Sequence, residues 1–221
     1  MHGSPHTVSD VMTRAVVAVG RDAPFKDVVE LMEQWKVSAL PVLEGEGRVI
    51  GVVSEADLLP KEEFRDSDPD RFLQRDRLAD LAKAGGLTAG ELMSTPAVTV
   101  HADATLAEAA RIMARRKVKR LPVVDGVDML QGVVSRADLL KVFLREDEEL
   151  TEEVRHEVVD RLFPLSADHI QVEVSEGVVT LTGWTDGPEL VKVAERLAGA
   201  VEGVVDVRCH LCPASVRSDS R

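Results

Sequence analysis

The pattern of apolar and polar residues predicts the same run of elements twice within the first 140 residues. Brief β-branched stretches, AVVAV at 15–19 and AVTV at 97–100, are typical of strands. Each is followed by apolar residues at the i, i+3, i+4, i+7 spacing of one helix face, with Asp22 and Asp103 in the position of an N-cap. These faces consist of Phe25, Val28, Val29 and Met32 in the first copy and Leu106, Ala109, Ala110 and Met113 in the second.

Two further strands and a closing helix complete each copy. ALPVLE and VIGVVS predict the strands of the first copy and EADLL its helix, while RLPVVD, LQGVVS and RADLL predict those of the second. Thr7 with Asp10, and Thr88 with Glu91, have the spacing of a capping box and predict a short entry helix. The predicted order is therefore a helical turn, then strand, helix, strand, strand, helix.

The two copies are an internal repeat. GVVSEADLL at 51–59 returns as GVVSRADLL at 132–140, and positions between 7 and 59 align without a gap to positions 81 residues later, as Asp57 does to Asp138. About fifty residues is close to the lower size limit for independent folding. We therefore expect the two copies to bury their apolar faces against each other.

The last third of the chain predicts a separate small domain. Val154, Val158 and Leu162 recur at intervals of four on a helix that Thr151 could cap. Alternating residues on both sides of Glu176-Gly177 predict a β-hairpin. PELVKVAERLAGA predicts another helix and VVDVRCHL a final strand, which gives the order helix, strand, strand, helix, strand.

Charge narrows the possible partners. The 221 residues carry a formal net charge of −12 and a pI near 5.0, which argues against general affinity for nucleic acid or anionic lipid. The N-terminal residues lack a basic segment followed by an apolar core, and no apolar run approaches the roughly 20 residues of a membrane span. These features predict a cytoplasmic protein that does not bind membranes.

The motifs LPVL…IGVVSEADLL and LPVV…QGVVSRADLL resemble the cystathionine-β-synthase (CBS) domain, which commonly occurs in tandem as a regulatory module. The resemblance covers about half the chain. It implies two β-α-β-β-α motifs packed sheet to sheet about a pseudo-twofold axis, with clefts that often bind adenine nucleotides. It also implies pairing of modules into a homodimer.

The resemblance assigns candidate ligand residues to two clefts. Ser and Asp at this spacing suit a phosphate and the two hydroxyls of a ribose, although the same pair is also a capping box. The first-cleft candidates are Ser38, Ala39, Pro41, Ser54 and Asp57. The second-cleft candidates are Lys119, Arg120, Pro122, Ser135, Arg136 and Asp138.

The copies differ in charge at equivalent positions. Lys119 and Arg120 replace Ser38 and Ala39, and Arg136 replaces Glu55, so we expect the second cleft to be more positive and to bind an oligophosphate more tightly. The run RRKVKR at 115–120 is also explained as the solvated C-terminal end of a helix. Arg14, near the first strand, could return charge to the first cleft.

The C-terminal segment resembles the BON domain, named for bacterial osmotic-stress and nodulation proteins, in its element order and in the glycines at 177, 183 and 203. Such domains have been linked to phospholipid. Residues 151–221, however, hold seven Lys or Arg against thirteen Asp or Glu, which would repel an anionic leaflet. A role in protein contact or ligand sensing fits this charge better.

Five segments result: a first CBS motif at 1–60, a charged and helical inter-repeat segment at 61–87, a second CBS motif at 88–146, a BON-like domain at 147–213 and a disordered tail at 214–221. In the inter-repeat segment a helix is expected from Asp70, with Phe72, Leu78 and Leu81 facing the module and Gly85-Gly86 ending it.

Enzymatic chemistry is not indicated. The sequence has no nucleophile elbow, P-loop or paired catalytic carboxylate, its histidines lack metal spacing, and Trp35 and Trp184 are interpreted as packing residues. Cys209 and Cys212 form one C-x-x-C, which alone is weak support for a metal or redox site. Two hypotheses remain, neither of which names the partner. In one, the CBS pair binds AMP, ADP or ATP and the BON-like domain relays its state to a protein; in the other, the pair is a ligand-independent dimerisation scaffold.

Overall fold

The structure is a computed structural model that describes residues 6–64 and 78–214, with side chains from residue 82 onward in the second range. It divides into two compact units, which are considered separately. One unit holds Thr7–Asp138, and the other holds the chain from Leu139 onward together with His6. The predicted helix start at Asp70, Phe72 and most of the predicted tail lie outside the described residues, as do the side chains of Leu78 and Leu81.

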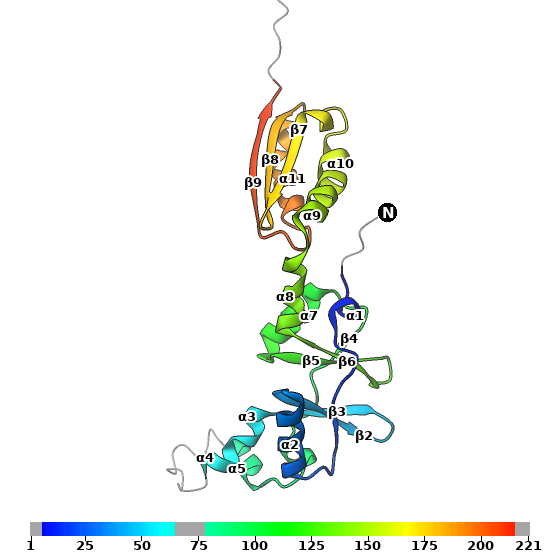
Figure 1. Cartoon of the computed structure of the whole chain (residues 1–221), viewed down its shortest axis with the longest axis vertical. Helices are drawn as coiled ribbons and strands as arrows, with labels where there is room; N and C mark the ends of the chain where they lie inside the picture. Colours follow the sequence, from blue (N-terminus) through cyan, green and yellow to red (C-terminus); the bar gives the residue numbers. More distant parts are fainter. Residues whose placement is uncertain (1–5, 65–77, 215–221) are drawn as a thin grey trace, which may run out of the picture. The chain divides into compact units, whose positions relative to one another are not determined.

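Both copies of the repeat have the predicted order of elements (Figure 1). The first comprises α1 (Val8–Val11), β1 (Val19–Gly20), α2 (Phe25–Trp35), β2 (Ala39–Glu44), β3 (Arg48–Ser54) and α3 (Glu55–Leu58). Helices α4 (Pro60–Glu63) and α5 (Leu78–Gly85) come next. The second comprises α6 (Ala89–Leu92), β4 (Val100–His101), α7 (Leu106–Arg116), β5 (Arg120–Val124), β6 (Leu130–Ser135) and α8 (Arg136–Leu140).

Each copy forms a three-stranded sheet with a mixed pattern. β1 is parallel to β2, which is antiparallel to β3, and β4, β5 and β6 repeat this arrangement. The first strand of each copy is only two residues long, so most of the predicted AVVAV and AVTV stretches are extended without pairing. Helices α2 and α7 bury one apolar stripe each, including Val28, Met32, Ala109 and Met113.

The two copies exchange their entry helices. Amides of Val8 and Ser9 in α1 donate to carbonyls of Ala104 and Ala102 in the second copy, and α6 returns the contact through Ala89 and Gly90 to Ala23 and Arg21. Ala89 and Leu92 belong to the apolar core of the first copy. The first copy therefore completes its core with a helix of the second, and α1 of the first is bound to the second copy with Val8 fully buried, so the two copies depend on each other to fold.

Close approach in this exchange accounts for a glycine in the repeated motif. A Cβ on Gly132 would lie 2.8 Å from Met12 Sδ, and a Cβ on Gly51 would meet Met93 in the same way. The neighbouring residues pair as isolated bridges, Thr13 with Val133 and Ser94 with Val52. The identity of the two GVVS motifs thus reflects packing as well as chemistry.

Helix capping confirms one sequence prediction and corrects another. The Asp10 carboxylate accepts from Thr7 N at 2.7 Å, and Glu91 accepts from Thr88 N at 3.2 Å, as expected for capping boxes. Asp22 and Asp103 are not N-caps. The long helices begin after Pro24 and Thr105 instead, because Thr105 forms its own capping box with Glu108.

The unit from Leu139 onward begins with a 3₁₀ turn at Lys141–Leu144 and then contains α9 (Asp147–Val154), a π-helical turn at Arg155–Val159, α10 (Asp160–Leu162), β7 (Ile170–Ser175), β8 (Val178–Thr185), α11 (Val191–Ala198) and β9 (Asp206–Pro213). Short 3₁₀ turns at Ala167–His169 and Pro188–Leu190 precede β7 and α11. β8 is central, antiparallel to β7 and parallel to β9. The helices cover one face of this sheet, with Val158, Phe163, Leu181 and Ala194 in the core (Figure 1).

Two turns in this unit explain their glycines. Glu176 and Gly177 both have positive φ, as a two-residue hairpin turn requires, and Asp147 accepts both of their amides at 2.8 and 2.9 Å. Gly183 has φ +124°, and a Cβ there would lie well under 3.0 Å from the His169 carbonyl oxygen. The predicted cap at Thr151 is wrong, because the helix starts at Asp147 and Thr151 donates to the Asp147 carbonyl inside it.

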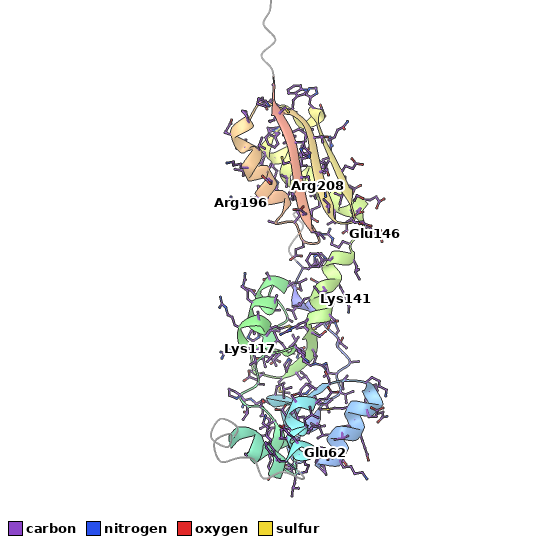
Figure 2. The ribbon with its side chains drawn as sticks, turned by 90° about the vertical axis from the view of Figure 1, so that its left-hand side faces the viewer. Glu62, Lys117, Lys141, Glu146, Arg196 and Arg208 are labelled. Atoms are coloured by element: carbon purple, nitrogen blue, oxygen red, sulfur yellow. The ribbon has the colours of Figure 1, made fainter. Side chains whose placement is uncertain are left out.

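Both tryptophans are more exposed than expected of packing residues. Trp35 is exposed at the end of α2, and Trp184 is 41% exposed on the uncovered face of the sheet. There the Trp184 ring stacks on His169 with ring centroids 4.0 Å apart. Figure 2 shows Arg208, which lies on β9 of the same unit, and Arg196 on α11. Trp184 therefore packs on a neighbouring ring, but at the surface of its unit and not in the core, and Trp35 is largely exposed.

Candidate functional site

A pocket of about 270 Å³ lies between the two copies of the repeat. The first copy supplies Ser38, Ala39, Val52 and Ser54–Asp57, and the second supplies Ser94, Pro96–Val98 and Lys117–Arg120. One part of the wall is apolar, formed by Val52, Pro96, Val98 and Val118, and another part carries hydroxyl, carboxylate and cationic groups. This combination suits a small molecule with both a flat apolar part and an anionic part.

Ser54 and Asp57 meet at the start of α3 as a capping box. Asp57 Oδ2 accepts from the Ser54 amide at 2.8 Å and from Ser54 Oγ at 2.6 Å. Asp57 is buried at 8% exposure although its residue type is usually exposed. The capping alternative is therefore realised, but it uses only one carboxylate oxygen, so it does not exclude a ligand at the other.

The second oxygen of Asp57 has partners from two other segments. Lys83 Nζ, from α5, forms an ion pair with Asp57 Oδ1, and Ser94 Oγ donates to the same oxygen at 3.1 Å. Lys83 also donates to Ser94 Oγ at 3.0 Å. The inter-repeat segment therefore contributes Lys83 as the cationic partner of Asp57 in the first cleft.

Arg120 crosses from the second copy to the first. Its Nη2 donates to Ser38 Oγ at 2.7 Å, and its Nη1 lies 3.4 Å from the Ala39 carbonyl oxygen. Burial lowers the pKa of the Arg120 guanidinium, and the nearby carboxylates of Glu55 and Asp138 oppose that shift. A guanidinium titrates so far above neutrality that it keeps its charge at the centre of the module.

The candidate cations are distributed differently from the sequence expectation. Lys119 and Arg120, expected beside Ser135, line the pocket that contains Ser54 and Asp57. Arg120 is also paired in the sheet with Ser135. The charge of Arg120 therefore lies between the two clefts and is not confined to the second. Arg14 follows Thr13, which pairs with Val133 of the second copy, and its Nη2 donates to the carbonyl and hydroxyl of Ser9; it does not line the pocket that contains Ser54 and Asp57.

The second Ser–Asp pair repeats the local geometry of the first. Asp138 Oδ2 accepts from the Ser135 amide at 2.9 Å and from Ser135 Oγ at 2.7 Å. Arg136 donates to the Val118 carbonyl from Nε at 3.2 Å and from Nη2 at 3.0 Å. Ser135, Arg136 and Asp138 do not line the 270 Å³ pocket. Pro41 and Pro122 are buried within β2 and β5, opposite Val52 and Val133, and do not line it either.

Several residues at this site were not singled out from the sequence. Ser94 and Pro96–Val98 line the pocket because α6 and the chain after it pack on the first copy. Lys83, on α5, does not line the pocket but pairs with Asp57, which does. The exchange of entry helices is a tertiary feature without a local motif. Alignment of the repeats pairs Ser94 with Thr13, but it does not show which copy each of these residues packs against.

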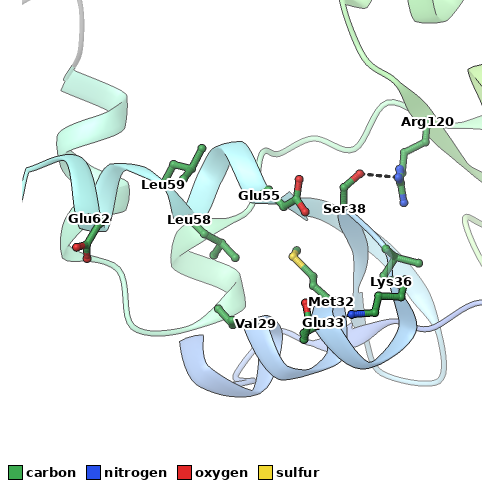
Figure 3. A pocket seen from close by; sticks show the side chains of 11 residues that line it. Val29, Met32, Glu33, Lys36, Ser38, Glu55, Leu58, Leu59, Glu62 and Arg120 are labelled. Carbon is green, nitrogen blue, oxygen red and sulfur yellow. Dashed lines mark hydrogen bonds and ion pairs between the residues drawn. The ribbon is translucent and has the colours of Figure 1, made fainter.

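An open groove of about 530 Å³ adjoins the pocket and shares Ser38, Glu55 and Arg120 with it (Figure 3). Val29 and Met32 of α2 line it together with Leu58 and Leu59. Val29 is 40% exposed and Leu59 is 64% exposed. The predicted inward position of Val29 is therefore wrong, because this side of α2 faces the groove rather than the core.

The two cysteines lie on opposite faces of β9. Cys209 packs against the core of the C-terminal unit, whereas Cys212 is exposed beside Trp184. Residues three apart on a strand point in opposite directions, so the thiols do not converge. Burial raises the pKa of the Cys209 thiol, which disfavours the reactive thiolate. Within residues 6–64 and 78–214, no group of three His, Cys, Asp or Glu side chains could hold a metal ion.

No helix in the described part of the chain has the length and apolarity needed to cross a membrane.

Known proteins share the two-copy arrangement. The family model of the CBS domain matches residues 8–61 and 89–145, and that of the BON domain matches residues 146–213. An uncharacterised protein of Methanocaldococcus jannaschii, MJ1426, is 27% identical over 160 residues, which cover 65% of this chain and 95% of that protein. The chloroplastic CBS domain-containing protein CBSX2 of Arabidopsis thaliana is 30% identical over 155 residues, or 63% of this chain and 64% of that protein.

Solved structures agree with this assignment. The crystal structure of CBSX2 in complex with AMP has a TM-score of 0.55 at 31% identity, and the match covers 63% of this chain and 97% of that one. MJ1225 of M. jannaschii, described as a putative archaeal homologue of γ-AMPK, has a TM-score of 0.51 at 26% identity, with coverage of 64% and 49%. The chain therefore belongs to the CBS domain family, as a tandem CBS pair followed by a BON domain.

Proposed function

We propose that this protein is a regulatory sensor whose CBS pair binds an adenosine-containing ligand of the AMP, ADP or ATP class. The observation that carries the proposal is the convergence, in one pocket, of an apolar wall, the Ser54–Asp57 pair and the cations Lys119 and Arg120. The crystallised relative CBSX2, whose structure aligns with this pair, holds AMP.

The pocket offers a complementary group for each part of such a ligand. Val52, Pro96, Val98 and Val118 provide apolar contact for a purine, and Asp57 is an acceptor for ribose hydroxyls. Lys119 and Arg120 complement phosphate, the guanidinium through its planar fork of donors. Ser38 and Ala39 complete the wall, with Pro41 supporting β2 behind it.

Ser135 and Asp138 form the second proposed site, by their equivalence to Ser54 and Asp57. Pro122 supports β5 in the same way as Pro41 supports β2. Arg136 adds a cation where the first copy has Glu55. We propose that this cleft is the tighter of the two for a phosphate-bearing nucleotide, since Arg136 complements phosphate where Glu55 of the first copy would repel it.

We further propose a homodimer in which a second molecule of this protein covers the groove between α2 and α3. Exposed Val29 and Leu59 give this groove an apolar floor. Helix α2 carries one lysine against three acidic residues, whereas its counterpart α7 carries three arginines against one glutamate. Opposite charges on equivalent helices favour head-to-tail association of the two protomers, with α2 of each protomer facing α7 of its partner.

For the BON domain we propose a relay to a protein partner, and for the whole protein a cytoplasmic, regulatory rather than catalytic role. Its excess of acidic residues supports a protein contact over an anionic membrane. Adenine nucleotides would be sensed where they are abundant, in the cytoplasm.

A thermal-shift screen with AMP, ADP, ATP and S-adenosylmethionine tests the proposal. Ligand at about a hundred times its Kd stabilises the folded state by about 2.7 kcal/mol. The second candidate function, a ligand-independent scaffold, is favoured by the capping role of both Ser–Asp pairs. It predicts no shift with any of the four compounds and an unchanged dimer.

A further inference from the structure

Lys83 is paired with Asp57, the carboxylate that the proposed function assigns to the ribose of a nucleoside. Oδ2 of Asp57 is taken by the helix cap, and Oδ1 accepts from Lys83 Nζ and Ser94 Oγ. Both oxygens of this carboxylate therefore have partners within the chain. A nucleoside hydroxyl can reach Oδ1 in good geometry only by replacing one of the two donors there.

The ion pair is shielded from water. The side chain of Lys83 is 19% exposed and that of Asp57 is 10% exposed. A shielded carboxylate that loses its cation needs other donors to offset its desolvation. The two hydroxyls of a ribose are such donors, so ribose and Lys83 are alternative partners for one acceptor.

The position of Lys83 depends on α5. Lys61 Nζ, in α4, donates to the carbonyls of Ala84 and Gly86 at 3.1 and 2.9 Å and lies 5.2 Å from the centroid of the Phe25 ring. This lysine fixes the C-terminal end of α5 against the first copy, which holds Lys83 over Asp57. For Lys83 to leave Asp57, either its side chain must change conformation or α5 must shift.

We infer that Lys83 is a specificity-determining residue of the first cleft, where its ammonium competes with the ribose of a nucleoside for Asp57. This inference rests on the proposed function, because it takes the cleft to be a nucleoside site. It predicts that the first cleft of the unaltered chain binds neutral nucleosides weakly, and that a ligand bound there releases the contact between α5 and Asp57.

The test is calorimetric titration with adenosine in an Asp138→Asn background, which disables the second cleft. Adenosine carries no phosphate, so the loss of a cation cannot weaken its binding directly. Lys83→Met removes the ammonium and keeps most of the side-chain length. We expect its affinity for adenosine to rise about tenfold or more, because a charge-assisted competitor is removed.

Two matched variants isolate the cause. Lys83→Arg keeps a cation at Asp57 and should keep the affinity low, and Lys192→Met, on the exposed side of α11 in the other unit, controls for the change in net charge. Folding is checked by circular dichroism. If Lys83→Met fails to fold, Lys83→Gln, which keeps length and polarity, replaces it in the same comparison.

The possible failures are distinguishable. If adenosine binds the Asp138→Asn parent and Lys83→Met binds it no more tightly, the inference is overturned while the proposed function stands. An equal gain in Lys83→Arg would overturn it too, since competition by a cation would not be the cause. If neither adenosine nor AMP binds any folded variant, the proposed function falls and the inference falls with it.

Discussion

Arg120 Nη2 donates to Ser38 Oγ at 2.7 Å, which joins the first residue of β5 to the residue just before β2 across the two copies of the repeat. Arg120 lines the pocket that contains Ser54 and is also paired in the sheet with Ser135, so one arginine at the centre of the module borders both clefts. Its counterpart in the first copy, Ala39, carries no charge. The two copies have nearly the same fold, but the second copy alone has a cation at this position.

Replacing Arg120 should separate phosphate binding from nucleoside binding. Arg120→Ala is expected to weaken AMP about tenfold to a hundredfold, the range for hydrogen bonds to charged groups. Adenosine should be affected much less, since it lacks the phosphate. Calorimetric titration of both ligands measures the difference. Arg48→Ala, at an exposed arginine in β3, is the control, and equal losses for AMP and adenosine would show that Arg120 has only a structural role.

The two ribose-binding carboxylates should contribute unequally. Asp138→Ala is expected to reduce affinity for AMP about tenfold to a hundredfold, because it leaves ribose donors unpaired in a partly buried cleft. Asp57→Ala should matter less, since the first cleft has Glu55 where the second has Arg136 and is expected to hold the nucleotide less tightly. Titration at one salt concentration gives the comparison. If Asp57→Ala abolishes binding and Asp138→Ala leaves it intact, the preferred cleft has been assigned wrongly.

Opposite charges on α2 and α7 should decide the dimer. Reversing Glu30 and Glu33 to arginine is expected to dissociate the head-to-tail dimer, because both of its contacts then place like charges together. Reversing Arg111 and Arg115 to glutamate as well should restore it. Light scattering at micromolar concentration reports the mass. A head-to-head dimer would not show this rescue, and a monomer in the unaltered chain would refute dimerisation itself.

The internal repeat allowed the order of helices and strands in the CBS pair to be predicted from the sequence, but not the residues at which the long helices begin. β2 at Ala39–Glu44 and β6 at Leu130–Ser135 were predicted to the residue, because alternating β-branched residues and flanking turns mark them. Asp22 and Asp103 failed as caps because the chain turns first, so that the N-cap lies two residues later in both copies and the helix starts three residues later. Local spacing does not distinguish these alternatives.

The composition of the pocket was harder to predict. Ser54 and Asp57 were found from their motif, and both line it. Lys83 and Ser94 were missed, since they reach Asp57 through the packing of α5 and the exchange of α6, neither of which leaves a signature in the chain. The same exchange places Lys119 on the first cleft. Contacts between segments far apart in sequence therefore determine which residues meet there.

Gly183 should not tolerate a side chain. Gly183→Ala is expected to destabilise the C-terminal unit by about 2 kcal/mol or more, because the residue has φ +124° and a Cβ would overlap the His169 carbonyl. Gly199→Ala is the matched control, since it has φ −69° and its nearest neighbour would lie at 3.4 Å. Urea unfolding followed by tryptophan fluorescence in a Trp35→Phe background, where Trp184 is the remaining tryptophan, compares them. Equal stability of the two variants would contradict the close approach at Gly183.

Acid should weaken the second copy through the cap of α7. Hydrogen bonds from the Thr105 amide and hydroxyl lower the pKa of Glu108 below its usual value. A lowered folded-state pKa means that the stabilisation is present above the pKa of the unfolded chain and is lost as the pH falls through the lower pKa of the folded chain. Glu108→Gln should therefore flatten the loss of stability between neutral pH and about pH 3, measured by urea unfolding. An unchanged slope would show that the cap does not contribute.

Titration of AMP into the full chain, beside the Asp57→Ala, Asp138→Ala double variant, tests the central claim most directly. The account predicts saturable heat with the unaltered protein, a rise in its unfolding temperature, and loss of both in the folded double variant. A folded, unaltered protein that gives neither heat nor a thermal shift at millimolar AMP would contradict it.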